Sequence, residues 1–363
     1  MKIIYIIITL LSVFILIGCS DEDDSTIIIP PIYNDTNSSE PYYYQQWYLD
    51  KDDTFYLQNG IDAQASINAG NMLKTYSAKG VKIAIIDDGV DTKHEDLTNS
   101  FVATYDITTK STDVSHTNAD EYHGTAVTGI IGARINSKGI AGIASQAQLI
   151  FLKDSETITD SQTIELFNKA EEFGADVINC SWGTYDVSDA VKAKIVDLAT
   201  NGRDGKGIII VFASGNDDID MGNDESAIPE VIGVSATNKY NERTSYTNHG
   251  PELDVMAPGG DYIGITTLDD SGSNGEASLN EDYFLFNDSY FFAGTSASAP
   301  IVSGVIGLML EKNPNLTRVQ IMNILKNSSD KIGSVEYVDG RNDYYGYGKI
   351  NLVNIMNHIQ EVK

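Results

Sequence analysis

Four polar residues in separate parts of the chain have the types that nucleophilic catalysis needs. The residues are Asp87 after the apolar run KIAII, His123 at the start of HGTAVTG, Asn216 in ASGN, and Ser296 in GTSASAP. A serine hydroxyl needs an imidazole to take its proton, and the imidazole needs a carboxylate to hold its tautomer. An asparagine amide can donate to an oxyanion that develops during the reaction. Together these residues predict acyl-transfer chemistry, provided that the fold brings them to one place.

Ser296 precedes a segment, IVSGVIGLML, that is apolar on nearly every face. Such a pattern is typical of a helix buried in a large core, and we expect Pro300 in its first turn. Ser296 then lies where unpaired N–H groups and the helix dipole favour negative charge. The alternative interpretation is that Ser296 only caps the helix.

Short apolar runs alternate with helical segments along most of the chain. Helices are expected from His123, Ser161 and Ser188, between buried strands over 81–87, 147–154, 176–182, 207–216 and 231–237. Alternating strands and helices indicate a mostly parallel sheet that is covered on both faces. We therefore predict a three-layer α/β/α fold in a single domain. In such a sheet, ligands bind beyond the carboxyl ends of the strands, where the four polar residues are expected.

The composition restricts the partners of this 363-residue chain. It has 52 acidic residues against 24 Lys and Arg, which gives a net charge of -28. Such a surface repels nucleic acid and anionic membranes, so we expect no nucleic-acid partner. The two cysteines, Cys19 and Cys180, cannot form a disulfide framework. Cys180 lies in an apolar strand and is expected to be a small buried hydrophobe and not a catalytic thiol.

The N-terminus, MKIIYIIITLLSVFILIGC, is typical of a secretion signal. Its last residues, LIGC, resemble the lipobox of bacterial lipoproteins, which implies cleavage before Cys19 and a lipid on that residue. We predict a signal peptide over 1–18, a tether over 19–39 and a catalytic unit over 40–358. The location is then outside the cytoplasm and lipid-anchored to the envelope, at the outer membrane, with surface exposure suggested by the acidic run 20–24. The alternative is an uncleaved membrane anchor.

Five segments resemble the signature blocks of subtilisin-like serine peptidases, with the kexin and furin branch as the nearest match. They are IIDDGVDTKHEDL, HGTAVTGIIGA, SWG, ASGN and GTSASAP, and the resemblance extends from about residue 40 to about residue 356. It implies that Asp87 is the triad acid, His123 the general base, Ser296 the nucleophile and Asn216 the oxyanion donor. The implied activity is a serine endopeptidase that acts on peptides or proteins. A non-catalytic peptide-binding lipoprotein is the alternative.

The resemblance also implies how a substrate is held. An extended peptide would pair with the SWG strand, and acidic side chains would select basic residues through charge-assisted hydrogen bonds. Asp88 and Asp120 match positions that receive a basic residue upstream of the cleaved one, and Asp186 matches the wall of the primary pocket. The strand residues are Ser181, Trp182 and Gly183. In a chain this acidic, the three carboxylates are alternatively solvated loop residues, and the loop DDIDMGNDES lacks the cysteines that this branch carries there.

Calcium is the cofactor that the resemblance implies. Hard oxygen ligands from separate segments suit Ca²⁺. The implied ligands are the side chains of Glu40, Asp96 and Asn136 and the backbone oxygens of Arg134, Lys138 and Ile140. A helix-capping role for Asp96 is the alternative.

The resemblance further predicts which domains accompany the catalytic unit. Secreted relatives carry a propeptide domain and kexin-like relatives a C-terminal β-rich domain. We expect neither in this chain, because only about twenty residues separate Cys19 from Glu40 and the chain ends on the helical segment NLVNIMNHIQEVK. We expect a monomer.

Overall fold

The computed structural model describes residues 39–117, 121–155, 157–272, 275–277, 279–280 and 282–359. The predicted signal peptide, Cys19 and nearly all of the predicted tether lie outside the described residues, and so does Asp120. Within the described ranges, no helix combines the length and the apolar character that crossing a bilayer requires.

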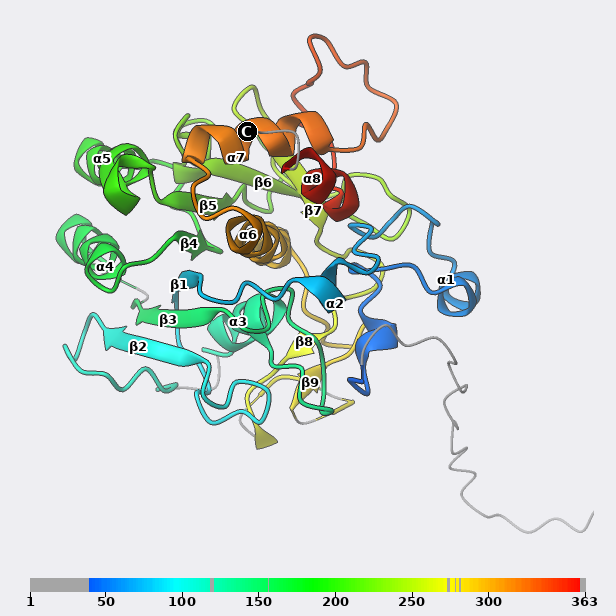
Figure 1. Cartoon of the computed structure of the whole chain (residues 1–363), viewed down its shortest axis with the longest axis horizontal. Helices are drawn as coiled ribbons and strands as arrows, with labels where there is room; N and C mark the ends of the chain where they lie inside the picture. The colour runs from blue at the N-terminus through cyan, green and yellow to red at the C-terminus, as the bar shows by residue number, and fades with distance from the viewer. Residues whose placement is uncertain are drawn as a thin grey trace, which may run out of the picture. The chain divides into compact units, whose positions relative to one another are not determined.

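A seven-stranded parallel sheet forms the centre of the fold (Figure 1). Its strand order is β2-β3-β1-β4-β5-β6-β7, which places β1 in the interior between β3 and β4. The strands are β1 (Lys82–Asp87), β2 (Phe101–Asp106), β3 (Gln148–Lys153), β4 (Val177–Cys180), β5 (Ile209–Ala213), β6 (Ile232–Thr237) and β7 (Val255–Pro258). A separate antiparallel pair joins β8 (Thr267–Leu268) to β9 (Tyr283–Phe284).

Helices cover both faces of the sheet. Figure 1 shows α4 and α5 on one side of the strands and α3 and α6 on the other. The helices are α1 (Asp53–Asn59), α2 (Met72–Thr75), α3 (His123–Gly132), α4 (Asp160–Glu172), α5 (Asp189–Gly205), α6 (Thr295–Lys312), α7 (Arg318–Ser328) and α8 (Leu352–Ile359). Short 3-10 turns span Tyr43–Gln45 and Glu225–Ala227. The predicted three-layer α/β/α architecture is confirmed.

The apolar strands form because both of their faces are buried. Ile86 packs in one cluster with Leu166 of α4 and Ile195 of α5. Ile83, three residues earlier in β1, points to the opposite face, where it lies close to Gly307 of α6. Because successive side chains of a strand point to opposite faces, a strand covered on both sides needs apolar residues throughout.

Strands β2 and β7 were not predicted from the sequence. Both are edge strands, and β2 (FVATYD) is only partly buried, so it lacks the continuous apolar run of an interior strand. β7 has four residues and ends on a proline. The position of Pro300 was also predicted wrongly: α6 begins at Thr295, so Pro300 is its sixth residue and lies inside the helix beyond the first turn.

The start of α3 packs directly against the end of β1. A side chain at Gly124 would place its Cβ 2.2 Å from the Gly89 carbonyl oxygen and 3.1 Å from Asp87 Cβ. Only a residue without a Cβ permits this approach. The glycine after His123 therefore brings the imidazole beside the last residue of β1.

Candidate active site

The carboxyl ends of the parallel strands meet at one edge of the sheet and place several polar residues there. Asp87 is the last residue of β1, Ser181 follows β4, and Asn216 lies three residues beyond β5. His123 is the first residue of α3 and Ser296 is the second residue of α6. The fold therefore gathers the predicted residues from five elements where parallel sheets bind ligands.

Asp87 and His123 form a short hydrogen bond. His123 Nδ1 lies 2.7 Å from Asp87 Oδ1, which also accepts from the N–H of Asp88 at 3.0 Å. The Asp87 carboxylate is buried, whereas the imidazole is half-buried. With Nδ1 held by the carboxylate, the other ring nitrogen, Nε2, remains available to take a proton.

The hydroxyl of Ser296 donates to the carbonyl oxygen of Ser181 at 3.0 Å. Among the described residues, no hydrogen bond joins this hydroxyl to His123. Catalytic hydrogen bonds are often made only once substrate is bound, and rotation about the Cα–Cβ bond of Ser296 redirects its oxygen. The structure thus brings Asp87 and His123 into direct contact and leaves the Ser296 hydroxyl hydrogen-bonded to the backbone.

Asn216 has its side-chain amide fixed by the start of α6. Its Oδ1 accepts from the backbone N–H of Thr295 at 2.9 Å and from the Thr295 hydroxyl at 3.0 Å. With the oxygen engaged, only the NH₂ group of Asn216 is left to donate. The Thr295 N–H is taken by Asn216 and the Ala297 N–H donates to the Gly294 carbonyl, so the backbone N–H of Ser296 is the second donor that the start of α6 offers here.

Negative charge surrounds the imidazole. Burial raises the pKa of Asp88 to about 7, and the neighbouring charge of Asp87 adds to this rise. Burial raises the pKa of Asp154 to about 8, with further contributions from Asp87 and Asp88. Burial alone would lower the pKa of His123, but the pair with Asp87 and the charges of Asp88 and Asp154 outweigh it and raise the pKa to about 9.

Asp154 is a residue that the sequence analysis missed. It follows β3 as Asp88 follows β1, and its N–H donates to the Asp87 carbonyl oxygen at 2.9 Å. The available signal was a carboxylate directly after the apolar run QLIFLK. Phe292 was missed as well: its ring lies 5.5 Å from the imidazole of His123 and packs against Phe284 of β9.

A cavity of about 180 Å³ opens beside Ser296. Its walls come from the SWG segment after β4, from the end of β5 and its following loop, and from the start of α6. The lining residues are Ser181, Trp182, Gly183, Tyr185, Ala213, Gly215, Asn216, Asp224, Thr295 and Ser296. The predicted substrate strand, the predicted oxyanion donor and the predicted nucleophile therefore share one cavity.

Asp224, and not the predicted Asp186, lines this cavity. The buried Asp224 carboxylate accepts from the N–H groups of Tyr185 and Ser226, both at 2.9 Å. Asp186 is exposed and accepts from the side chain of Asn223 at 2.8 Å. Asp224 lies in the loop that departs from the kexin-like pattern, so the pattern gave no reason to select it.

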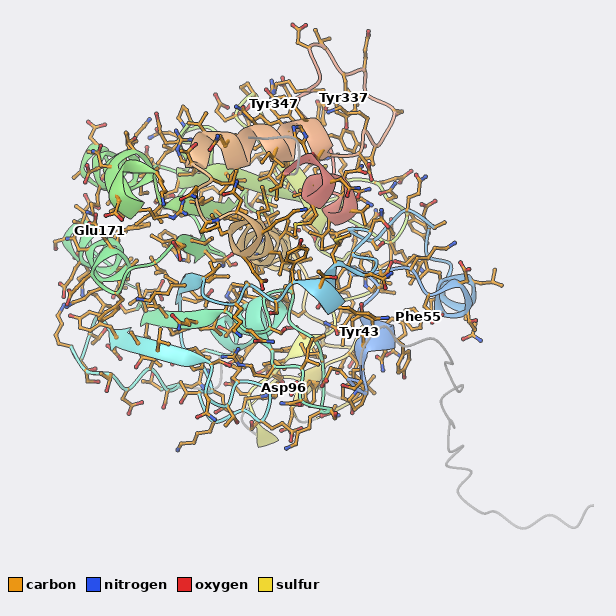
Figure 2. The ribbon with its side chains drawn as sticks, viewed as in Figure 1. Tyr43, Phe55, Asp96, Glu171, Tyr337 and Tyr347 are labelled. Atoms are coloured by element: carbon orange, nitrogen blue, oxygen red, sulfur yellow. The ribbon has the colours of Figure 1, made fainter. Side chains whose placement is uncertain are left out.

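The residues predicted to bind calcium come together around the loop 134–140. Glu40 accepts from the N–H groups of Ser137 and Lys138, both at 2.8 Å. Asp96 (labelled in Figure 2) is buried, and its Oδ2 accepts from the N–H of Ile140 at 3.1 Å. Asn136 donates through its Nδ2 to the Glu95 carbonyl at 3.2 Å, which leaves its side-chain oxygen for another partner.

Asp96 also has a buried oxygen, Oδ1, without a hydrogen-bond partner in the described part of the chain. Burial raises the pKa of Asp96 to about 7. A buried carboxylate oxygen without a donor is costly unless a cation compensates it. The donor set of carboxylate, amide and backbone oxygens fits Ca²⁺.

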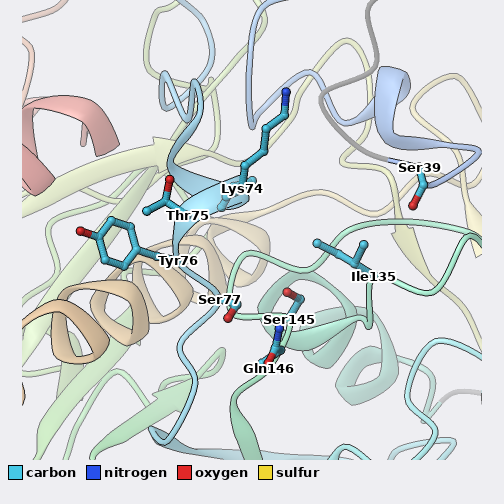
Figure 3. Close-up of a pocket in the computed structure, with 9 residues that line it drawn as sticks. Ser39, Lys74, Thr75, Tyr76, Ser77, Ile135, Ser145 and Gln146 are labelled. Atoms are coloured by element: carbon cyan, nitrogen blue, oxygen red, sulfur yellow. The ribbon is translucent and has the colours of Figure 1, made fainter.

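A larger hollow of about 480 Å³ lies away from the catalytic residues, between α2 and the segment 135–146. Figure 3 shows Lys74 extending its amine away from Ser77, Ser145 and Gln146. The residues that line this hollow include none of Asp87, His123 and Ser296. It is therefore separate from the candidate active site.

The charges around the imidazole predict the titration of His123. In Asp154→Asn, the imidazole pKa should fall from about 9, because a negative charge that favours the imidazolium has been removed. NMR titration of the ring resonances measures this pKa directly. Asp113→Asn, which changes an exposed carboxylate that accepts from Ser115, serves as the control. An unchanged titration in Asp154→Asn would contradict this description of the site.

Three comparisons with known proteins show which family and fold the chain resembles. Residues 78–348 match the Subtilase family. The calcium-dependent protease of Nostoc sp. is 35% identical over 337 residues, which cover 84% of this chain and 50% of that protein. Subtilisin of Bacillus pumilus is 31% identical over 284 residues, which cover 76% of this chain and 91% of that protein. A serine protease of Aeromonas sobria, solved in complex with a chaperone, superposes with a TM-score of 0.79 at 21% identity, covering 89% of this chain and 67% of that one.

The chain spans about half the length of the calcium-dependent proteases that it matches. The likeness to the Aeromonas sobria structure concerns the fold alone, because the identity is only 21%. The family match, in contrast, extends over residues 78–348 and includes every strand of the sheet and helices α3 to α7. On this evidence, the chain belongs to the Subtilase family.

Proposed function

We propose that the protein is a serine endopeptidase that hydrolyses peptide bonds through Asp87, His123 and Ser296. The observation that carries this proposal is the 2.7 Å bond between Asp87 and His123 at the sheet edge where α6 presents Ser296. Membership of the Subtilase family supports it. An imidazole oriented by a buried carboxylate is the base that a serine nucleophile needs.

The residues would act in two stages. His123 Nε2 takes the proton from the Ser296 hydroxyl as its oxygen attacks the scissile carbonyl, and the imidazolium then gives this proton to the leaving amine. The Nδ2 group of Asn216 and the backbone N–H of Ser296 donate to the oxyanion. The same imidazole then takes a proton from water as the water oxygen attacks the acyl-enzyme, and the imidazolium gives this proton to Ser296 Oγ as the acyl bond breaks.

The alternative is a protein that holds peptides in the same cleft without cleaving them. Ser296→Ala separates the two functions, because it removes the nucleophile but leaves the cavity walls in place. Peptide hydrolysis should fall by about 10⁶-fold, and labelling by a fluorophosphonate should disappear. Ser329→Ala, which removes a buried hydroxyl that donates to the Leu325 carbonyl in α7, is the matched control. Equal hydrolysis by Ser296→Ala and the parent chain would refute the catalytic role.

We also propose that the enzyme prefers basic residues at the cleavage site. In support, Asp224 lines the cavity beside Ser296, where its carboxylate would bind a basic side chain at the cleaved position. Asp88 and Asp154, beside the imidazole, form a second acidic region, which would bind the substrate residue that precedes the cleaved position. Asp186 and Asp120, which the kexin-like resemblance selected, are further candidates, although Asp186 lies outside the cavity lining and Asp120 outside the described residues.

Peptides that differ only in having Arg or Leu at the cleaved position test this preference. The parent enzyme should cleave the Arg peptide with a kcat/KM at least about 10-fold higher, and Asp224→Asn should reduce that ratio, because a charge-assisted hydrogen bond becomes a neutral one. Asp220→Asn changes an exposed carboxylate of the same loop and is the control. Equal rates for the two peptides would exclude the preference.

We propose a structural calcium ion held by the side chains of Glu40, Asp96 and Asn136 and by the backbone oxygens of the loop 134–140. The partnerless Asp96 oxygen and the name of the Nostoc relative support this proposal. When bound, the ion would compensate the two carboxylates and join the N-terminal segment to the loop. The backbone ligands would be Arg134, Lys138 and Ile140.

Chelation tests the calcium site through stability. EDTA should lower the melting temperature of the parent chain, since an ion that binds only the folded state stabilises it. Asp96→Asn should melt at a lower temperature and lose most of its response to Ca²⁺. Asp197→Asn, which changes an exposed carboxylate on α5 that accepts from Asn201, should keep the full response. A melting temperature of the parent chain that is independent of chelator and calcium would count against the site.

We further propose that the chain is attached to the cell envelope through a lipid on Cys19. Support comes from the sequence alone, in the lipobox-like LIGC and the polar tether that follows it. Such an anchor would hold the catalytic unit outside the cytoplasm, within reach of extracytoplasmic peptides.

A further inference from the structure

Helix α6 has a gap in its hydrogen-bond ladder at the residue that we propose as the nucleophile. In an α-helix, each carbonyl oxygen accepts from the N–H four residues later. For Ser296 that residue is Pro300, which has no N–H. The Ser296 carbonyl therefore lacks the usual helix bond from the residue four positions later, although a buried carbonyl normally needs a partner.

The hydroxyl of Ser181 fills this gap. Ser181 Oγ donates to the Ser296 carbonyl oxygen at 3.0 Å. In return, Ser296 Oγ donates to the Ser181 carbonyl oxygen, also at 3.0 Å. The residue that follows β4 and the second residue of α6 are thus joined by two reciprocal bonds, one of which replaces the bond that Pro300 cannot make.

Two buried residues set the direction of the Ser181 hydroxyl. Asn179 donates through Nδ2 to Ser181 Oγ at 3.0 Å, so the Ser181 proton must point elsewhere, toward Ser296. Ser303 in turn donates to Asn179 Oδ1 at 2.8 Å. Asn179 and Ser303 are fully buried. Ser303 lies seven residues beyond Ser296, which is two turns along the same face of α6.

We propose that Ser303, Asn179 and Ser181 form a positioning chain for Ser296. Each member donates to the next, and the chain ends on the carbonyl group of the nucleophile itself. Linked donors of this kind strengthen one another and restrict rotation of the hydroxyls. The chain ties the start of α6 to the end of β4, and so fixes the backbone from which the Ser296 hydroxyl extends. This inference rests on the proposed peptidase function.

Position matters here because small displacements of a nucleophile are costly. A shift of about 1 Å at a reacting group can reduce a rate by about 10²-fold. The proline that opens the helix ladder would leave Ser296 free to shift if the Ser181 hydroxyl were absent. Asn179 and Ser303 are fully buried, so they act on the reaction only through Ser181 and Ser296. The Ser181 hydroxyl acts through the Ser296 carbonyl, whereas its backbone belongs to the predicted substrate strand.

A double-mutant cycle between Ser181→Ala and Pro300→Ala tests this proposal. The readouts are the second-order rate of fluorophosphonate labelling and the separate kcat and KM for one peptide. Ser181→Ala alone should slow labelling by about 10-fold and lower kcat with little change in KM, as expected for one lost hydrogen bond to the nucleophile backbone. In the Pro300→Ala background the same change should cost less than about 3-fold, because the new N–H restores the helix bond to Ser296.

Ser303→Ala provides a milder variant, should Pro300→Ala disturb folding. It should slow labelling to a smaller extent than Ser181→Ala, and Ser303→Thr, which retains a hydroxyl, should recover the rate. Ser329→Ala, which removes a distant buried hydroxyl, is the control for general loss of stability. It should label at the parent rate.

Several outcomes would overturn the proposal. They are labelling of Ser181→Ala or Ser303→Ala at the parent rate, or an equal loss for Ser181→Ala in both backgrounds. Absence of labelling in the parent chain would instead refute the peptidase function, and this inference with it. The two failures are therefore distinguishable.

Discussion

The hydrogen bond between Asp87 and His123 requires the end of β1 and the start of α3 to pack closely together. The bond joins Oδ1 of Asp87, at the end of an interior strand, to Nδ1 of His123, the first residue of a helix, at 2.7 Å. The Asp87 carboxylate is buried. The glycine after His123 permits that approach, because any side chain there would collide with the backbone of Gly89. The ring of Phe292 lies 5.5 Å from the imidazole, at a tilted angle. The close packing of α3 on the end of β1 therefore also sets the distance between the Asp87 carboxylate and the His123 imidazole.

Charge is the second constraint on this site. Asp87, Asp88 and Asp154 lie around a single imidazole. Burial raises the pKa of both Asp88 and Asp154, and repulsion among the carboxylates adds to this rise. A cationic group that approached this edge would relieve the repulsion. The same physical argument underlies the proposed preference for basic substrates and fits a chain with a net charge of -28. The acidic site and the acidic surface therefore both agree with the proposed preference for cationic peptides.

Much of the fold could be predicted from the sequence, because buried parallel strands leave continuous apolar runs. The runs at 81–87 and 231–237 became β1 and β6 within one residue at each end. Edge strands such as β2 carry no such run and were missed. Asp87, His123 and Ser296 could be selected because their segments resemble family blocks, whereas Asp154 and Asp224 lie in segments without a block. Their roles depend on which strand ends become neighbours, which is a property of the sheet order.

Hydrogen-bond partners were the least predictable feature. The position of Pro300 inside α6 frees the Ser296 carbonyl, yet the partner that replaces the helix bond, Ser181, lies 115 residues earlier in the chain. No local pattern indicates such a pair. Asp96 gives a similar example. Its sequence position suggested a calcium ligand, but only the structure shows that one of its buried oxygens has no hydrogen-bond donor among the described residues.

The pH dependence of fluorophosphonate labelling tests most directly whether Asp87 and His123 activate Ser296. The imidazole must be neutral to take the serine proton, and its pKa is raised to about 9. The labelling rate should therefore rise through alkaline pH with a single midpoint near 9. A rate that does not change between about pH 6 and about pH 10 would contradict the account, because it would show that no titrating base assists the nucleophile.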